Sequence, residues 1–330
     1  MLTSFETGKF VISLDFELLW GVRDKRTIEN YGNNILGVRQ VIPALLDVFS
    51  KYDIKATFSA VGFLFAKNKE QLLDYCPVVK PGYRDINLSP YTILDKIGND
   101  ENDDPYHFGY SLLQQIKENG NHEIGTHTFS HYYCLEPGQT PEAFMHDLEA
   151  AKKIAAAANI EVKSLVFPRN QFNEEYLSVC KETGIESFRG NPVSWLYSGR
   201  NKNSETHFRR ALRFIDMHIN LTGHHCHTRQ FVSSSLLVNV AASRFLRPYS
   251  KSLSFLDPLR LRRIKRAMLH AAKNKKLFHL WWHPHNFGIN LKENIHFLEK
   301  ILGYYTYLKT KYNFSNHTMK GIADQLRPKG

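Results

Sequence analysis

The chain has 330 residues, 42% of them hydrophobic and 13% aromatic, which is enough for a sizeable core and argues against global disorder. Its four cysteines lie far apart with no CxxC pair, which argues against a zinc ribbon or a disulfide framework and favours free thiols. The formal net charge is +11.

The positive charge is concentrated in one segment. Between Arg244 and Lys276 there are eleven Lys or Arg residues and one acid, Asp257, and eleven minus one gives +10. A solvated helix face with a loop is the simpler interpretation, and a patch that meets an anionic membrane leaflet or an anionic substrate is the alternative. We expect no nucleic acid as a partner, because we recognise no nucleic-acid-binding module in the sequence.

Segments with the pattern of buried strands alternate along the chain with segments of helical periodicity. The strands are expected at residues 9–16, in the first part of 54–65, and at 121–128, 163–168, 185–190 and 276–283. The helices are expected at residues 37–52, 111–120, 140–158, 173–184, 257–276 and 292–310. This alternation predicts parallel strands joined by crossover helices.

Three further features complete the predicted organisation. The N-terminal segment shows neither a signal peptide nor a membrane span, since Asp15 and Glu17 interrupt its apolar run, so a cytoplasmic location is expected. The polar stretch 76–107 is either a substrate loop or a small insertion, and residues 190–276 are irregular and then basic. We therefore expect one elaborated α/β domain over residues 1–330.

Helix ends are marked by capping residues. Thr140 precedes Pro141, a pair typical of an N-cap and the first helical position. Asp257 is expected to cap the N-terminus of the basic helix, and Gly120 is expected to close the helix at 111–120. These signals fix where three of the crossovers begin or end.

Polar side chains follow four of the predicted strands at the point where each strand ends. Because parallel α/β folds place their chemistry at the C-terminal ends of strands, we expect these side chains to share one rim. They are Asp15 and Glu17 after the first strand, His127 and His131 after the third, Arg169 and Asn170 after the fourth, and His283 and His285 after the last.

The residue types on this rim suit a metal-dependent hydrolase. His127 and His131, at i and i+4 on a helical turn, would lie on one face and bind one metal ion. Two histidines and a carboxylate form a common catalytic zinc set, in which the ion lowers the pKa of a bound water to about 7. One carboxylate of the pair Asp15 and Glu17 would join the metal and the other would act as base, while His283 would protonate the leaving group.

Each residue taken alone also has a simpler interpretation. Arg169 is expected to hold the base carboxylate in its ionised form, with a structural ion pair as the alternative. The histidines at 283–285 are also typical of a turn beside a proline. The histidine-rich segment 223–227 is expected to be a polar loop, and His122 to be structural or exposed. Because several acidic, histidine and arginine side chains follow the ends of different predicted strands, a shared site is favoured.

Five ordered blocks of the sequence resemble the motifs of the polysaccharide deacetylases, carbohydrate esterase family four, also called the NodB-homology group. The blocks are "FVISLDFE", "ATFSAVGFLF", "EIGTHTFSH", "VFPRNQ" and "FHLWWHPH", and they span roughly residues 10 to 290. The resemblance implies a distorted (β/α) barrel of about seven parallel strands, here with an inserted loop region. It also implies removal of acetyl groups from N-acetylated sugars with a divalent metal ion, usually zinc.

The resemblance assigns roles by motif. His127 and His131 match the metal-binding histidines, and Asp15 matches the acid that acts as base. The family's second acid, a metal ligand, falls on Phe16, which cannot coordinate a metal. Glu17, one residue further on, therefore takes that role, and Asp15 is the alternative ligand.

The later motifs depart slightly from the family pattern. The third motif normally runs Arg then Pro, whereas this chain has the reverse order, Pro168 then Arg169. His283 matches the family's catalytic histidine after an apolar strand, with His285 as the alternative. Trp281 or Trp282 is expected to line an acetyl pocket.

These observations predict a metal-dependent carbohydrate N-deacetylase in cytoplasmic polysaccharide or glycan biosynthesis. The basic segment 244–276 would then contact an anionic membrane peripherally or bind a phosphorylated carrier. Two alternatives remain: an amidohydrolase that acts on a non-sugar amide, and a glycan-binding relative without catalytic activity.

Overall fold

The computed structural model describes residues 4–197, 207–233 and 235–326. The strands are β1 (Lys9–Phe16), β2 (Thr57–Ala60), β3 (Glu123–Thr126), β4 (Ser164–Leu165), β5 (Ser187–Phe188), β6 (Val238–Asn239), β7 (Arg244–Phe245), β8 (Leu277–Trp282) and β9 (Ser315–His317). The α-helices are α1 (Ile28–Leu36), α2 (Val38–Lys51), α3 (Lys69–Asp74), α4 (Tyr110–Asn119), α5 (Pro141–Ala157), α6 (Glu174–Glu182), α7 (His207–His218), α8 (Arg229–Val232), α9 (Asp257–Lys273), α10 (Leu291–Tyr312) and α11 (Met319–Leu326).

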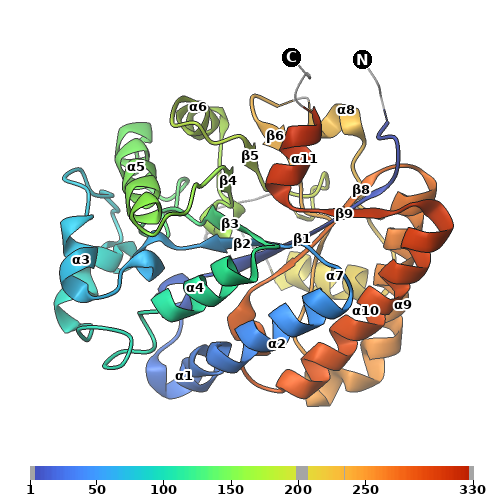
Figure 1. The fold of residues 1–330 in the computed structure, drawn as a ribbon, viewed down its shortest axis with the longest axis horizontal. Helices are drawn as coiled ribbons and strands as arrows, with labels where there is room; N and C mark the ends of the chain where they lie inside the picture. Colours follow the sequence, from blue (N-terminus) through green and yellow to red (C-terminus); the bar gives the residue numbers. More distant parts are fainter. Residues whose placement is uncertain (1–3, 198–206, 234, 327–330) are drawn as a thin grey trace.

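The strands form one parallel sheet that curves into a partial barrel. Their order is β6-β5-β4-β3-β2-β1-β8-β7, and β9 pairs with the N-terminal half of β1. The helices lie outside the sheet, with α2, α4 and α10 along one side and α5 and α6 along another (Figure 1). The prediction of a distorted (β/α) barrel is confirmed, with eight strands along the path instead of about seven.

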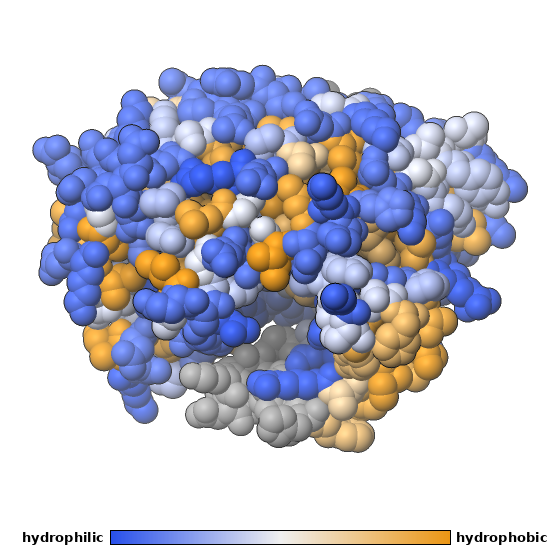
Figure 2. Space-filling view, turned by 90° about the horizontal axis from the view of Figure 1, so that it is seen from below, coloured by the Kyte–Doolittle hydropathy of each residue, from blue (hydrophilic) through white to orange (hydrophobic). Residues whose placement is uncertain are grey.

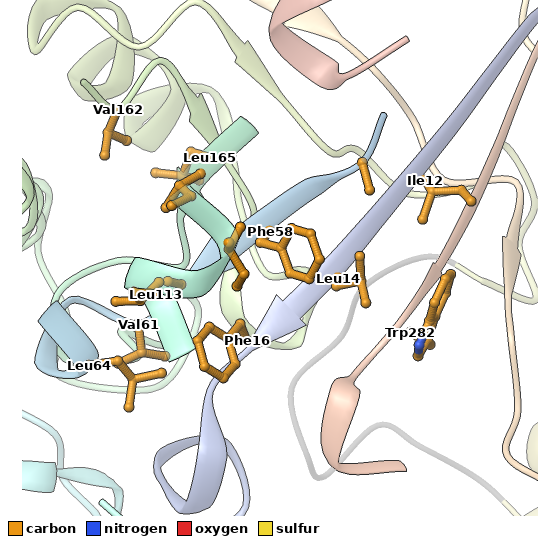
Figure 3. Packing of buried hydrophobic residues seen from close by; sticks show 14 of the residues in the cluster. Ile12, Leu14, Phe16, Phe58, Val61, Leu64, Leu113, Val162, Leu165 and Trp282 are labelled. Carbon is orange, nitrogen blue, oxygen red and sulfur yellow. The ribbon is translucent and has the colours of Figure 1, made fainter. Parts of the chain in front are cut away.

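Strand β1 lies at the centre of the sheet and separates two environments. Ile12, Leu14 and Phe16 point into the apolar core, where Phe16 lies near Phe58 (Figure 3). The alternation of a strand sends the next residues to the opposite side. There Asp15 is buried among polar groups at the C-terminal end of the strand. The first strand therefore delivers one carboxylate to the barrel interior while its other face packs against the helices.

The capping signals are confirmed at two helices and shifted at the third. The Thr140 side chain accepts a hydrogen bond from the Ala143 backbone N–H at the start of α5. Gly120 ends α4 with a φ of 74°, in the left-handed region that glycine adopts without strain. Asp257 is the first residue of α9 and not its N-cap, which is Leu256.

The polar stretch 76–107 folds against the rim of the barrel. It contains two 3₁₀ helices, Ile86–Leu88 and Pro90–Lys96. Within it the hydroxyl of Tyr83 accepts a hydrogen bond of 2.8 Å from the backbone N–H of Tyr133, and both tyrosines are buried. The segment thus supports the loop that carries His131. In the described part of the chain, every helix is too short or too polar to cross a membrane.

His279 in β8 makes the stability of the fold sensitive to acid. Its Nδ1–H donates to the carbonyl of Val240 at 2.7 Å, and its Nε2 accepts from the Ser13 hydroxyl at 2.8 Å. Burial lowers the pKa of His279 from 6.5 to about 3. Because the folded-state pKa lies below the unfolded value, the contribution to stability is present above pH 6.5 and is lost as the pH falls.

We expect His279→Gln to flatten the acid dependence of stability. Between pH 7 and pH 5, the low pKa of His279 lowers the free energy of unfolding of the wild-type protein by about 2 kcal/mol. The variant lacks this group and does not show this part of the loss. Urea titrations at pH 7 and pH 5 measure this difference, and comparison with wild type cancels the other buried histidines. Equal losses in the two proteins would show that His279 is not buried in its neutral form.

Candidate metal centre

The loop after β3 brings His127 and His131 together, although not on a helical turn as the spacing predicted. Thr128 and His131 have φ values of 65° and 58°, so the chain turns through left-handed residues. The two imidazole rings end with their centroids 4.9 Å apart. A loop held in this unfavourable backbone conformation needs support from its surroundings.

Asp147 of α5 provides that support. Its carboxylate accepts hydrogen bonds from the backbone N–H of Phe129 at 2.7 Å, from that of Ser130 at 3.1 Å and from the Ser130 hydroxyl. Asp147 is fully buried and contacts neither histidine directly through a hydrogen bond. It therefore fixes the backbone between the two imidazoles.

We expect Asp147→Ala to lower the free energy of unfolding by about 3 kcal/mol, because two backbone N–H groups lose a charged acceptor inside the protein. Affinity for a divalent metal should fall as well, since the loop between His127 and His131 is released. Chemical denaturation and a metal titration check these effects against Asp74→Ala, which removes an exposed carboxylate of α3. Metal affinity equal to that of the control would contradict the supporting role of Asp147.

Glu17 lies at the centre of a cluster of four imidazoles. Its Oε2 is 3.3 Å from Nε2 of His127 and 3.1 Å from Nε2 of His131. Its Oε1 is 3.1 Å from Nε2 of His285 and 3.7 Å from Nε2 of His283. Burial alone would raise the pKa of the Glu17 carboxyl, but the imidazoles, led by His283, hold it well below its usual value.

The donor set around Glu17 fits a divalent cation. The Nδ1–H of His127 donates to the carbonyl of Val166 at 2.8 Å, so neutral His127 presents an unprotonated Nε2 to Glu17 Oε2. Two lone pairs that face each other at 3.3 Å repel unless a cation or a proton lies between them. Burial lowers the pKa of His131 to about 4, against the opposing effect of Glu17, so the His131 imidazole is neutral at pH 7.

Two triads in the described chain bring three metal-ligating atoms within reach of one another. One is Glu17 with His127 and His131, as predicted, and the other is Glu17 with His283 and His285. The Asn286 amide donates to Nδ1 of His283 at 3.2 Å, which places the proton of neutral His283 on Nε2. A protonated Nε2 cannot bind a metal ion, so Glu17, His127 and His131 form the better metal site.

The protonated Nε2 of His283 instead faces the carboxylates of Asp15 and Glu17. Its Nε2 lies 3.7 Å from Asp15 Oδ2 as well as from Glu17 Oε1. Burial lowers the pKa of His283 below 6.5, although Glu17 and Asp15 both raise it. His285 lies on the other side of Glu17, and its Nδ1 is 2.9 Å from the Tyr31 hydroxyl. His285 was expected on this rim and as the alternative to His283, whereas Tyr31 is a contributor that the sequence did not single out.

Arg189, and not Arg169, holds the Asp15 carboxylate. The two atoms Nη1 and Nη2 of Arg189 donate to Oδ1 and Oδ2 of Asp15 at 2.6 and 2.7 Å. Nη1 also donates to the Ser13 hydroxyl at 3.1 Å, and Nη2 to Oδ1 of Asn170 at 3.2 Å. Burial would raise the pKa of the Asp15 carboxyl, but Arg189 reverses this and keeps it below its usual value.

The prediction that Arg169 pairs with the base carboxylate is therefore wrong. Arg169 has a φ of 55°, and its guanidinium pairs with Asp24 and, at 3.1 Å, with Glu136. It also lies 3.9 Å above the ring of Tyr133. The strand β4 before it is only two residues long, and the left-handed turn that follows directs the side chain to the outer rim.

Arg189 carries the same sequence signal as the residues that were predicted. It is the first residue after β5, the strand expected at 185–190, at its C-terminal end. The rule that selected polar residues at strand ends therefore includes it. Of the two tryptophans, Trp281 lines the cavity with Asp15 and Glu17, whereas Trp282 is buried in the apolar core against Phe287.

The site opens into a cavity of about 370 Å³ that is lined by Glu17, His127, His131 and His283. Hydrophilic residues predominate on the face drawn in Figure 2 and border part of a hollow in its lower half. The histidines of 223–227 lie outside this cavity: His224 receives a hydrogen bond from Arg263, and His227 is buried beside the Ala242 carbonyl. The expectation of a structural loop there agrees with these contacts.

The basic segment 244–276 is less exposed than a solvated helix face would be. Three of its arginines, Arg244, Arg260 and Arg263, are buried. Arg263 Nη2 and Arg244 Nη2 each lie 3.7 Å from the carboxylate of Asp216. Part of the positive charge of this segment therefore lies inside the protein and not on its surface.

Comparisons with known proteins agree with the fold. Residues 30–188 match a family model described as polysaccharide deacetylase. No curated protein matches the sequence of this chain. The match includes His127 and His131, whereas Asp15, Glu17 and His283 lie outside it.

Solved structures with low identity share the architecture. A candidate polysaccharide deacetylase from Mycobacterium smegmatis is 12% identical with a TM-score of 0.57, over 99% of this chain and 93% of that one. A candidate polysaccharide deacetylase from Pseudomonas aeruginosa is 10% identical with a TM-score of 0.56, over 96% and 89%.

A CE4 family pseudoenzyme from Bacillus anthracis is 13% identical with a TM-score of 0.46, and this chain spans 66% of its length. The match over residues 30–188 confirms that this part of the chain resembles the polysaccharide deacetylase family, as its sequence motifs predicted.

Proposed function

We propose that the protein is a metal-dependent hydrolase that removes the acetyl group from an N-acetylated sugar. The observation that carries this proposal is the convergence of one buried carboxylate, Glu17, on Nε2 of His127 and His131, beside the ion pair of Asp15 and Arg189. A ligand triad next to a separate ionised carboxylate suits metal-assisted hydrolysis of an unactivated amide.

Each group has a distinct task in the proposed reaction. A divalent ion held by Glu17, His127 and His131, with zinc favoured by this ligand set, would supply Lewis acidity to the acetyl carbonyl and to water. Asp15 is ionised at neutral pH and accepts the proton of the attacking water. In its imidazolium form, His283 donates the Nε2 proton to the amine nitrogen as the carbon–nitrogen bond breaks, and it becomes a neutral imidazole. The products are acetate and a free amino sugar.

Arg189 acts through Asp15. Its two hydrogen bonds fix the plane of the carboxylate and keep it charged inside the protein. The Ser13 hydroxyl accepts a hydrogen bond from Arg189 and donates one to Nε2 of His279. These bonds help to hold the Arg189 guanidinium in place. Trp281 packs against Arg189, with the guanidinium carbon 4.0 Å from the ring centroid, and closes this side of the cavity.

The proposal places this activity in cytoplasmic glycan biosynthesis. Support comes from four free cysteine thiols, of which Cys134 and Cys180 are buried. Thiols of this kind suit a reducing compartment.

The direct test is acetate release from N-acetylated mono- and oligosaccharides before and after treatment with a chelator. We expect release that disappears on chelation and returns with added zinc. Release that survives complete metal removal would overturn the proposal, and hydrolysis of non-sugar amides alone would replace the substrate class.

A further inference from the structure

A second cavity, of about 350 Å³, opens beside the candidate metal centre. The two cavities share five lining residues, namely Arg169, Asn170, Phe245, Trp281 and His283. A molecule bound at the metal centre can therefore extend past His283 into the second space. The proposed reaction does not use this space, so its lining indicates what else the substrate carries.

Arginines dominate the charge of the second cavity. Arg213, Arg244 and Arg247 line it, and none of the described lining residues is an acid. Arg247 is exposed, and its guanidinium forms no ion pair with a described acid. Although the residue as a whole is exposed, partial burial of the guanidinium lowers the pKa of Arg247, as does the nearby charge of Arg213, whereas Tyr197 raises it. Like charges this close oppose one another, and a bound anion would relieve their repulsion.

Arg244 is buried and has side-chain donors that lack a partner. Its side chain is 5% exposed, yet its Nε and Nη2 lack a hydrogen-bond partner in the described structure. The nearest carboxylate, Asp216, is 3.7 Å from Nη2 and is shared with Arg263 at the same distance. Asp216 also accepts a 2.8 Å hydrogen bond from the Tyr197 hydroxyl. One carboxylate thus faces two buried guanidinium groups, and Arg244, which lines the cavity, has two donors left without a hydrogen-bond partner in the described structure.

An aromatic wall joins the two cavities. The rings of Trp281 and Phe245 lie 4.7 Å apart between centroids, and both residues line both spaces. Aromatic faces provide an apolar surface on which the C–H groups of a sugar ring pack. A ring on this wall would have the metal centre on one side and the arginines on the other.

We propose that the second cavity binds a phosphoryl group attached to the N-acetylated sugar, so that the substrate is a sugar phosphate or diphosphate. This inference rests on the proposed function, which places the acetamido group at the metal centre. Arginine forks match phosphate oxygens, and two or three guanidinium groups suit the charge of a phosphoryl group better than the single charge of a carboxylate. The group attached beyond the phosphate is a nucleoside, a lipid or hydrogen.

The test compares substrates that share one N-acetylated sugar. They are the neutral methyl glycoside, the sugar 1-phosphate, the nucleotide diphosphosugar, a short-chain prenyl diphosphosugar and an N-acetylated uronate. We expect kcat/KM for at least one phosphorylated substrate to exceed that for the methyl glycoside by about tenfold or more. The best of the three phosphorylated substrates identifies the attached group.

Arg247→Gln should lower kcat/KM for that substrate about tenfold and leave the methyl glycoside unchanged. The matched control is Arg262→Gln, which removes an exposed arginine of α9 outside the second cavity and should change neither. Equal rates for neutral and phosphorylated substrates, preference for the uronate, or equal effects of the two variants would overturn the phosphate site. In these cases deacetylation itself still stands.

A binding measurement separates the two proposals if no substrate is hydrolysed. Calorimetric titration with glucose 1-phosphate, which has no acetamido group, should give about tenfold weaker binding to Arg247→Gln than to wild type or Arg262→Gln. That result supports the phosphate site while the deacetylase proposal fails. Equal binding to all three proteins contradicts the phosphate site.

Discussion

Replacing Glu17 with Gln is expected to abolish stoichiometric metal binding and to reduce acetate release more than about 100-fold, since it removes a ligand and its charge together. The Glu17 carboxylate lies 3.3 Å or less from Nε2 of both His127 and His131, and its two oxygens are shared among four imidazoles. An amide in its place would present an N–H to at least one unprotonated nitrogen. Elemental analysis and an acetate assay measure the two effects.

The control for this experiment is Glu118→Gln, which makes the same chemical change on the exposed surface of α4. It should keep the metal content and activity of wild type. If Glu17→Gln also retained a full equivalent of metal and wild-type activity, Glu17 would not be a ligand, and Asp15 would be the next candidate for that role.

Replacing Arg189 with Met is expected to reduce kcat about 100-fold or more and to move the acid limb of the pH profile upward. Arg189 lowers the pKa of the Asp15 carboxyl, so its removal raises that pKa. The base must be ionised to accept a proton, and therefore activity would be lost at a higher pH than in wild type. Arg189→Lys keeps the charge without the paired hydrogen bonds and should restore part of the shift.

Stability should change too, because removal of one partner from a buried ion pair leaves an uncompensated charge and costs about 3–5 kcal/mol. Arg169→Met is the informative control. It breaks the pairs with Asp24 and Glu136 but leaves the Asp15 carboxylate with its partner. The acid limb should then stay in place. An upward shift in Arg169→Met and none in Arg189→Met would reverse the two roles.

The fold was predictable wherever a strand and its neighbouring helix both carried a strong pattern. Strand β1 has the predicted bounds, 9–16, because eight residues with an apolar alternate face leave little freedom. The helices α5 and α10 also follow their predicted positions, since long apolar stripes define both and the Thr140 cap marks the start of α5. In contrast, α1 was missed, because its sequence "IENYGNNIL" contains a glycine and three asparagines, residues of low helix propensity.

The sequence predicted most residues of the candidate site, but it predicted less well which of them contact one another. His127, His131, Glu17 and His283 meet as the strand-end rule expects. The partner of Asp15 was missed because the strand expected at 185–190 included Arg189, whereas β5 ends at Phe188 and leaves Arg189 as the first residue beyond the strand. The left-handed turn at Arg169 has no signature in the sequence, and it decides which arginine reaches the interior.

The most direct test of the account is a crystal structure of the protein grown with zinc, with anomalous diffraction recorded at the zinc absorption edge. The account predicts one strong peak bound by Nε2 of His127, Nε2 of His131 and a carboxylate oxygen of Glu17, with Asp15 still paired to Arg189. A peak bound instead by His283 and His285, or no peak within reach of Glu17, would contradict it.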